Sequence, residues 1–327
     1  MSFVPRLAGT TWTAGSGISA TNELHAVTNG TATVNGVTGN VLVAVGGNRT
    51  TGVNGFLFYS TDGISWAAPT SGIPVMSNLN AATSSNPNAA ISSPTAYLAA
   101  GTGGVILTSP DAITWTQQIS TNTTSDLYAL ASNGAGGYVA VGANGTIIYS
   151  NGNGGTTWLA PVAGSGTPNT LYGVTYANGM YVAVGATGTL LTSIDQGATW
   201  LHAGWTATSA SNTLNSVAYG GASVSQGVTS GTNTFVVVGA AGTLVTSVDG
   251  GVSWTLQALP VTTSNLNSVT YGHQFIAVGD SGSVYTSLDG LSWISQTSTT
   301  TTPLYAITHR RFDYSAAGGA GLTLHSM

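Results

Sequence analysis

The chain has 327 residues, of which 42 % are hydrophobic and only 4 % are charged. Four arginines, no lysine and nine acidic residues give a formal net charge of −5, the opposite of the basic surface that binds nucleic acid through its phosphates. No apolar run approaches the ~20 residues of a membrane-spanning helix, and the absence of cysteine excludes disulfides, thiolate metal sites and thiol nucleophiles.

The N-terminal segment is not typical of a secretory signal. MSFVPRLAGTTWTAGSG (1–17) lacks both the charged start and the apolar core that such signals need. It contains TTWTAG (10–15), a short strand pattern with Trp12. Tryptophan recurs in a similar context along the whole chain, so this segment belongs to a repeated pattern.

A pattern of three short segments then recurs seven times. The second segment always ends in glycine: VLVAVG (41–46), YLAAG (97–101), YVAVG (138–142 and 181–185), FVVVG (235–239), FIAVG (275–279) and YSAAG (314–318). The third always ends in serine: GFLFYS (55–60), GVILTS (104–109), GTIIYS (145–150), GTLLTS (188–193), GTLVTS (242–247), GSVYTS (282–287) and GLTLHS (321–326). Short runs of β-branched and aromatic residues bounded by Gly and Asn indicate strands.

These repeats predict an all-β fold: a seven-bladed β-propeller of four-stranded antiparallel blades, with 1–327 forming a single domain. A period of roughly 40–45 residues with four short strands is typical of a propeller blade. In six repeats a tryptophan begins the outer strand: Trp66, Trp115, Trp158, Trp200, Trp254 and Trp293. The seventh repeat lacks this strand, and Trp12 supplies it. Blade 7 is therefore expected to combine about 303–327 with 8–15, closing the ring and removing an exposed strand edge.

The turn before each outer strand has its own signature. SIDQGATW (193–200) is matched by STDGISW (60–66), SPDAITW (109–115), SVDGGVSW (247–254) and SLDGLSW (287–293), whereas SNGNGGTTW (150–158) lacks the Asp. Ser and Asp side chains cap backbone N–H groups in tight turns, and glycine permits positive φ. Five copies at equivalent places predict a structural turn rather than one active site.

With these turns the chain resembles the Asp-box, or BNR-repeat, propeller superfamily over nearly its full length. The superfamily includes sialidases, other glycosidases, sorting receptors and photosystem assembly-factor-like proteins, so the resemblance implies a fold more than an activity. It also implies that the box turns lie away from the ligand-binding face. The amino-acid composition of the chain is similar to that of phage virion and appendage proteins.

Catalytic residues are sparse. A sialidase needs three converging arginines and a Tyr–Glu pair, but the only arginines are Arg6, Arg49, Arg310 and Arg311, and the only glutamate is Glu23. Outside the box turns, Glu23, Asp126, Asp280 and Asp313 are the remaining acids; Glu23 and Asp126 precede inner strands and leave a glycosidase pair as a weak alternative. The five histidines lack metal-ligand spacing. We therefore predict a protein without catalytic activity, cofactor or metal.

Binding residues are sought in irregular loops and around the channel. Trp205 is the one tryptophan outside the repeated positions, and Arg49 lies in a long loop, GNRTTGVNG (47–55). The second position of each inner strand forms a ring of polar and aromatic residues: His25, Asn80, Tyr128, Tyr172, Asn215, Asn267 and Tyr305. Equivalent positions in a closed ring should surround the channel near one mouth. The predicted binding residues are Trp205, Arg49, His25, Tyr128, Tyr172 and Tyr305. Local packing of Trp205, and water or hydrogen bonds between blades for the ring, remain alternatives.

Two main functions follow from these patterns. The first is a non-enzymatic virion component (phage tail or fibre) or surface component, located on a virion or the extracellular surface, that mediates attachment or protein–protein assembly. The second is a freestanding lectin-like propeller that binds glycans. The expected partners are assembly proteins or a host-surface glycan or receptor, with no nucleic acid and no membrane insertion; a glycoside hydrolase is the weaker third function.

Overall fold

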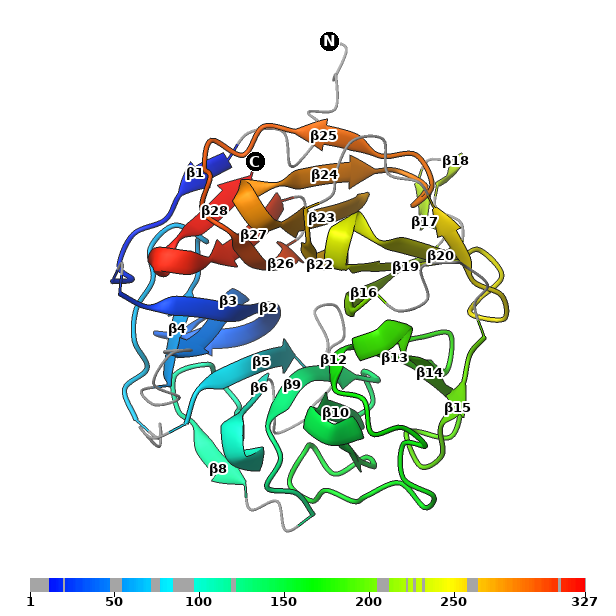
Figure 1. The fold of residues 1–327 in the computed structure, drawn as a ribbon. Coiled ribbons are helices and arrows are strands. Elements are labelled where there is room, and N and C mark those ends of the chain that lie inside the picture. Colours follow the sequence, from blue (N-terminus) through cyan, green and yellow to red (C-terminus); the bar gives the residue numbers. More distant parts are fainter. Residues whose placement is uncertain are drawn as a thin grey trace.

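The fold is a ring of small sheets. The computed structural model describes residues 12–19, 21–47, 55–71, 77–84, 97–118, 122–204, 212–221, 223–225, 228–230, 233–257, 264–310 and 313–326. Seven antiparallel sheets stand around a central axis, with the first strand of each innermost (Figure 1). The predicted all-β, seven-bladed propeller is confirmed.

The strands are numbered in chain order. Blades 1 to 4 contain β2 (Glu23–Val34), β3 (Val37–Gly47), β4 (Phe56–Ser60); β5 (Leu79–Ser84), β6 (Tyr97–Gly101), β7 (Ile106–Ser109), β8 (Thr116–Gln118); β9 (Leu127–Ser132), β10 (Tyr138–Gly142), β11 (Ile147–Ser150); and β12 (Leu171–Ala177), β13 (Met180–Gly185), β14 (Leu190–Ser193), β15 (Leu201–His202). Blades 5 to 7 contain β16 (Leu214–Gly220), β19 (Thr234–Gly239), β20 (Leu244–Ser247), β21 (Thr255–Gln257); β22 (Leu266–Tyr271), β23 (Phe275–Gly279), β24 (Val284–Ser287), β25 (Ile294–Gln296); and β26 (Leu304–Arg310), β27 (Asp313–Gly318), β28 (Thr323–Ser326), β1 (Trp12–Ala14). A separate hairpin pairs β17 (Ser223–Ser225) with β18 (Val228–Ser230).

Short 3₁₀ turns join the second and third strands of six blades. They are η1 (Thr102–Gly104), η2 (Ala143–Gly145), η3 (Ala186–Gly188), η4 (Ala240–Gly242), η5 (Asp280–Gly282) and η6 (Gly319–Gly321). Each of these turns has three residues, so the loops between the second and third strands of these blades are short.

The N-terminal strand closes the ring. β1 pairs antiparallel with β28 at the outer edge of blade 7, with Trp12 opposite Ser326 and Ala14 opposite Leu324 (Figure 1). Beyond the strand, the Gly15 N–H donates to Thr323 O at 2.9 Å and the Ser16 N–H donates to Ile64 O at 2.7 Å. The segment therefore connects blade 7 to blade 1. The expected boundary at residue 8 lies outside the described residues.

The outer strand is shorter than predicted in blades 1 and 3. Among the described residues, these blades have only isolated bridges, Tyr59 with Ala67 and Tyr149 with Leu159, in place of a fourth strand. Each bridge is followed two residues later by a proline, Pro69 or Pro161. Proline has no N–H to donate, so it ends the ladder after a single pair.

A β-bulge recurs at the start of every inner strand. In each blade the pairing register skips the residue after the first leucine of that strand, so that Leu24 and Ala26, for example, face Gly46 and Val45 of β3 and His25 lies at the register shift. The skipped residues are His25, Asn80, Tyr128, Tyr172, Asn215, Asn267 and Tyr305. A bulge re-aims the side chain of its extra residue, and here it turns seven side chains toward the channel.

The bulge explains the glycine that ends every second strand. A Cβ atom at this glycine, which in blade 1 is Gly46, one residue before the end of β3, would lie 1.8–2.3 Å from the carbonyl oxygen of the residue before the first leucine of the inner strand. The seven positions are Gly46, Gly101, Gly142, Gly185, Gly239, Gly279 and Gly318. At Gly239 the φ angle is −166°, an extended value open to any residue. The close approach of two backbones, rather than a special φ, is what requires glycine.

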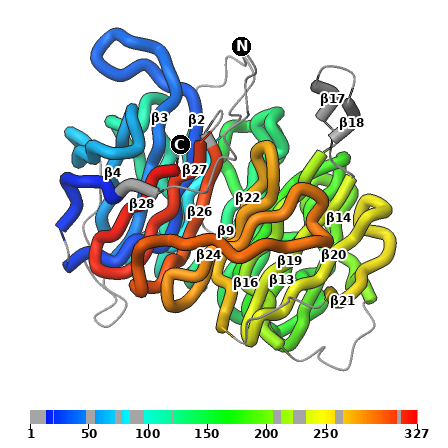
Figure 2. Tube along the Cα trace, turned by 90° about the horizontal axis from the view of Figure 1, so that it is seen from above, coloured from blue at the N-terminus to red at the C-terminus, as the bar shows by residue number. Residues whose placement is uncertain are grey.

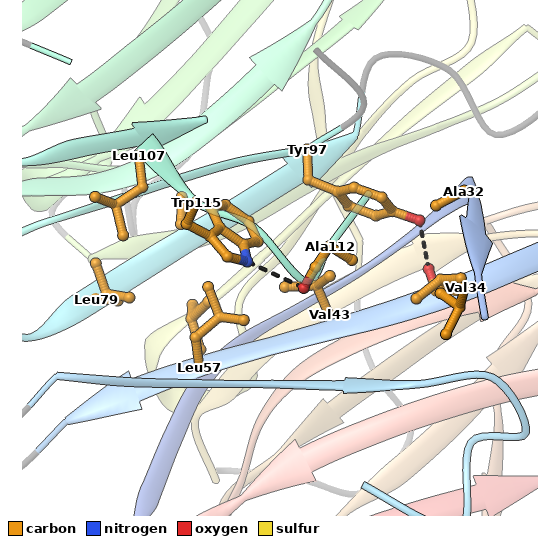
Figure 3. Packing of buried hydrophobic residues seen from close by; sticks show 12 residues of the cluster. Ala32, Val34, Val43, Leu57, Leu79, Tyr97, Leu107, Ala112 and Trp115 are labelled. Carbon is orange, nitrogen blue, oxygen red and sulfur yellow. Dashed lines mark hydrogen bonds between the residues drawn. The ribbon is translucent and has the colours of Figure 1, made fainter. Parts of the chain in front are cut away.

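The hydrophobic core is divided among the interfaces between blades. In one of them Trp115 and Ala112 of blade 2 pack with Val43 and Leu57 of blade 1 (Figure 3). Tyr97 is fully buried and donates its hydroxyl to Val41 O at 2.9 Å. Similar clusters fill the other junctions. Each blade therefore depends on its neighbours, which explains why a closed ring is needed.

The Ser–Asp turns before the outer strands, called box turns below, are built as the sequence indicates. In blade 1 the Ser60 hydroxyl donates to Asp62 Oδ1 at 2.9 Å, and the N–H groups of Ile64 and Ser65 donate to the same oxygen at 2.8 and 2.7 Å. The turns around Asp111, Asp195, Asp249 and Asp289 repeat this arrangement. In blade 3 the Asn153 side chain accepts from the Ser150 hydroxyl in place of the missing Asp.

We expect these carboxylates to make the fold acid-sensitive. Burial opposes ionisation of Asp62, but hydrogen bonds from Ser65 and Ile64 outweigh it and lower its pKa to about 2; hydrogen bonds from Ser253 lower the pKa of Asp249 to about 2. Because the folded pKa lies below the ordinary value of ~3.9, the stabilisation is complete above that pH and is lost as pH falls toward 2. Melting curves should show the fall between about pH 4 and 2. An Asp62→Asn variant, which copies Asn153, should fold and show a shallower fall; an unchanged slope would contradict the assignment.

Candidate functional site

The central channel has two different mouths. We call the face on which the inner strands begin the leading face, and the face that carries the box turns the box face. At the leading mouth, a cavity of about 220 Å³ is lined by all seven bulged residues. The predicted ring around one mouth is thus present in the structure, whereas its role in binding remains a prediction.

Four of the seven bulged side chains are tied to the next blade. The Asn80, Asn215 and Asn267 amides donate to the carbonyl oxygens of Leu127, Leu266 and Leu304 at 3.1, 2.8 and 3.0 Å, and His25 Nδ1 lies 3.1 Å from Leu79 O. Since a carbonyl only accepts, Nδ1 of His25 carries the proton. These bonds each cross a blade junction, so the hydrogen-bond alternative accounts for this part of the ring.

Tyrosines occupy the other three places. In the described part of the chain, no equivalent bond joins Tyr128 to Leu171 or Tyr172 to Leu214. The rings of Tyr128 and Tyr172 instead pair at a centroid distance of 5.7 Å and a tilt of 36°, and Tyr172 is 38 % exposed. Burial and then the Asp126 carboxylate, to which its hydroxyl is hydrogen-bonded, raise the pKa of Tyr128. All three tyrosines line the cavity at the mouth.

Three carboxylates stand beside residues that line this cavity. Asp126 contacts Tyr128, Asp280 Oδ1 accepts from Asn267 at 3.0 Å, and Glu23 Oε2 lies 3.9 Å from His25 Nε2. They come from blades 3, 6 and 1 and are spread around the ring. The leading mouth is therefore acidic at several points.

The opposite mouth has a different character. Its cavity of about 470 Å³ is lined mainly by small polar side chains, among them Thr28, Thr83, Thr175 and Thr308. His309 also lines it, and burial followed by the charge of His273 lowers the pKa of His309. The β2–β3 hairpin extends beyond the body of the ring on this side (Figure 2).

Most of the exposed apolar side chains in the described residues lie at the outer edge of blades 3 to 6, a feature that the sequence reasoning missed; Ile64, in the corresponding turn of blade 1, is also exposed. We call the set on blades 3 to 6 the apolar rim: Leu159, Val162, Ile194, Leu201, Val248, Val252, Leu288, Leu291 and Ile294. They lie in box turns and next to the outer strands, on the circumference where β15 and β25 run (Figure 1). The signal was the residue between Ser and Asp in the box, which is Ile194, Val248 or Leu288 in blades 4 to 6 but Thr61 or Pro110 in blades 1 and 2.

Several predicted features are not tested by the structure. Trp205, Arg49, Arg6 and Arg311 lie outside the described residues. Within the described ranges, no group of three or more His, Asp or Glu side chains is arranged to hold a metal ion. No helix in that part of the chain has the length and hydropathy to span a membrane.

The fold is shared with known propellers. No protein-family model and no curated protein matches the sequence. The chain is similar in structure to YCF48 bound to D1 peptide (TM-score 0.68, 15 % identity, covering 96 % of this chain and 94 % of that one) and to YCF48 from Cyanidioschyzon merolae (0.66, 16 %, 96 % and 98 %). It is also similar to the WD40 β-propeller domain of Doa1 (0.67, 10 %, 97 % and 97 %). The likeness is one of fold.

Proposed function

We propose that this protein is a non-catalytic, protein-binding propeller of the Asp-box superfamily, acting as a virion (phage tail or fibre) or surface component in attachment or assembly. The apolar rim carries the proposal. Nine exposed apolar side chains lie on four consecutive blades, and exposed apolar residues that gather on a protein surface are typical of protein-binding sites. In support, a propeller of similar fold is known with a bound peptide, and a lysine-free, cysteine-free composition suits a rigid extracellular assembly.

The acidic residues outside the box turns support binding rather than hydrolysis. Asp126 Oδ1 accepts from the Gly103 N–H at 2.9 Å, and the Asn265 amide oxygen accepts from the equivalent Ala241 N–H at 3.0 Å. An amide thus does in blade 6 what a carboxylate does in blade 3. Because this task needs no ionisable group, Asp126 has a structural role that a glycosidase acid would not share.

Assembly through the rim is testable in the cells or particles that contain the protein. A tagged chain should co-sediment with a large particle or surface fraction, and a triple variant Leu201→Ser, Val252→Ser, Ile294→Ser should remain soluble. The three side chains are 66–83 % exposed, so their loss should shift melting by less than about 2 °C. A wild-type chain that stays in the soluble fraction, or a triple variant that still co-sediments, would contradict the proposal.

A further inference from the structure

Tyrosines line the cavity at the leading mouth from two sides. Blades follow one another around the ring in chain order (Figure 1), so blade 7 lies opposite the junction of blades 3 and 4. Tyr305 of blade 7 therefore stands across the channel from the Tyr128–Tyr172 pair. A volume of about 220 Å³ is below the ~300–1,000 Å³ of pockets that hold whole drug-sized ligands. The space fits one side chain or one small ring.

The charges around the cavity determine the charge of the group that it can bind. Asp126, Asp280 and Glu23 each contact a lining side chain, and no Lys or Arg belongs to the described lining. Aromatic ring faces add partial negative charge and attract cations within about 6 Å. A carboxylate or phosphate would be repelled here, whereas a cation would be attracted by the carboxylates that stand directly behind the lining residues.

We propose that the leading mouth binds a basic side chain, lysine or arginine, of a protein partner. This rests on the proposed protein-binding function, because it names what the partner presents. Tyr128 and Tyr172 both line the cavity with their rings paired at a centroid distance of 5.7 Å, and Tyr172 is exposed. Asn80, Asn215 and Asn267, held by the next blade, keep the wall rigid so that the guest orders few protein groups.

Small probes test the cavity without knowledge of the partner. Nα-acetyl-lysine methylamide and its arginine analogue should bind the full chain with millimolar affinity in calorimetry or NMR titration. The norleucine analogue, similar in shape but neutral, should bind at least about tenfold more weakly, because it lacks the cation–π and ionic attraction. Raising the salt concentration should weaken binding of lysine but not of norleucine. Equal affinities for lysine and norleucine, or no binding of the lysine probe, would overturn the proposal.

Three variants separate ring faces from hydroxyl groups. Tyr172→Phe keeps the aromatic face and should bind the lysine probe as wild type does, whereas Tyr172→Leu should bind about fivefold more weakly. Asp126→Asn should also weaken binding and still fold, since Asn265 holds the equivalent turn in blade 6; melting curves check this.

A neutral glycan guest would behave differently. Methyl hexosides, added as competitors, should leave lysine binding unchanged; a hexoside that displaces the probe and is lost in Tyr172→Phe would overturn the basic-guest proposal in favour of a sugar. The triple rim variant should bind the probe normally. If the lysine probe does not bind but the wild-type chain co-sediments, only the cavity proposal is wrong. If the probe binds but the chain does not co-sediment, only the assembly function is wrong.

Discussion

Deleting residues 1–15 should lower the melting temperature by roughly 10 °C and replace cooperative unfolding with a broad, aggregating transition. The deletion removes β1 and leaves β28 as an unpaired edge, which invites pairing between molecules. It also uncovers Trp66, which is 6 % exposed in the closed ring and lies against Gly15. Together these losses are expected to reach about 5 kcal/mol, at ~2 °C per kcal/mol for a domain of this size. Scanning calorimetry and light scattering measure both effects.

A circular permutant supplies the matched control. Moving residues 1–15 to the C-terminal side of Met327 through a short flexible linker places TTWTAG after the third strand of blade 7, as in the other blades. This permutant should unfold cooperatively near the wild-type temperature. If the truncated chain melts like the wild type, or the permutant aggregates like the truncation, β1 does not hold the ring closed.

The fold was predictable because its signals repeat. Seven glycines and seven serines at fixed places predicted the repeated blade, and Trp12 indicated the strand that closes the ring. The shortened outer strands of blades 1 and 3 were also readable in principle, since Pro69 and Pro161 follow the same pattern. They were missed because the tryptophan occurs at the same place in these repeats and indicates a strand there, whereas the proline limits the hydrogen bonds that this strand can form.

The site was predictable only in outline. The ring of bulged residues and its division into amides and tyrosines follow from the sequence, but the hydrogen bonds from the amides to leucine carbonyls of the next blade and the pairing of Tyr128 with Tyr172 depend on distances between blades. The repeat pattern of the sequence does not give the distances between blades. The exposure of Ile194, Val248 and Leu288 is likewise a property of the folded surface, so an apolar residue in a turn was read as part of the turn alone.

Replacing Gly239 by alanine should destabilise the protein by roughly 2–3 kcal/mol. A Cβ atom at this position would lie 2.2 Å from Thr213 O. Gly239 is paired with Leu214 in the ladder of β16 and β19, and Thr213 O accepts from the Ala240 N–H at 2.8 Å. Neither strand can move away without stretching hydrogen bonds to its neighbours. Urea or thermal unfolding of the variant measures the loss.

The control is a glycine with space around it. At Gly39, in the β2–β3 hairpin, an added Cβ would meet nothing within 4 Å, so Gly39→Ala should change stability by less than about 0.5 kcal/mol. Gly185→Ala, with its Cβ 2.2 Å from Thr170 O in blade 4, should repeat the loss seen at Gly239. If Gly239→Ala and Gly185→Ala have the same melting temperature as Gly39→Ala, the two backbones are not held in contact, and the repeated glycine needs another cause. If only the first two lose stability, the bulge that aims seven side chains at the channel is also what requires glycine opposite each of them.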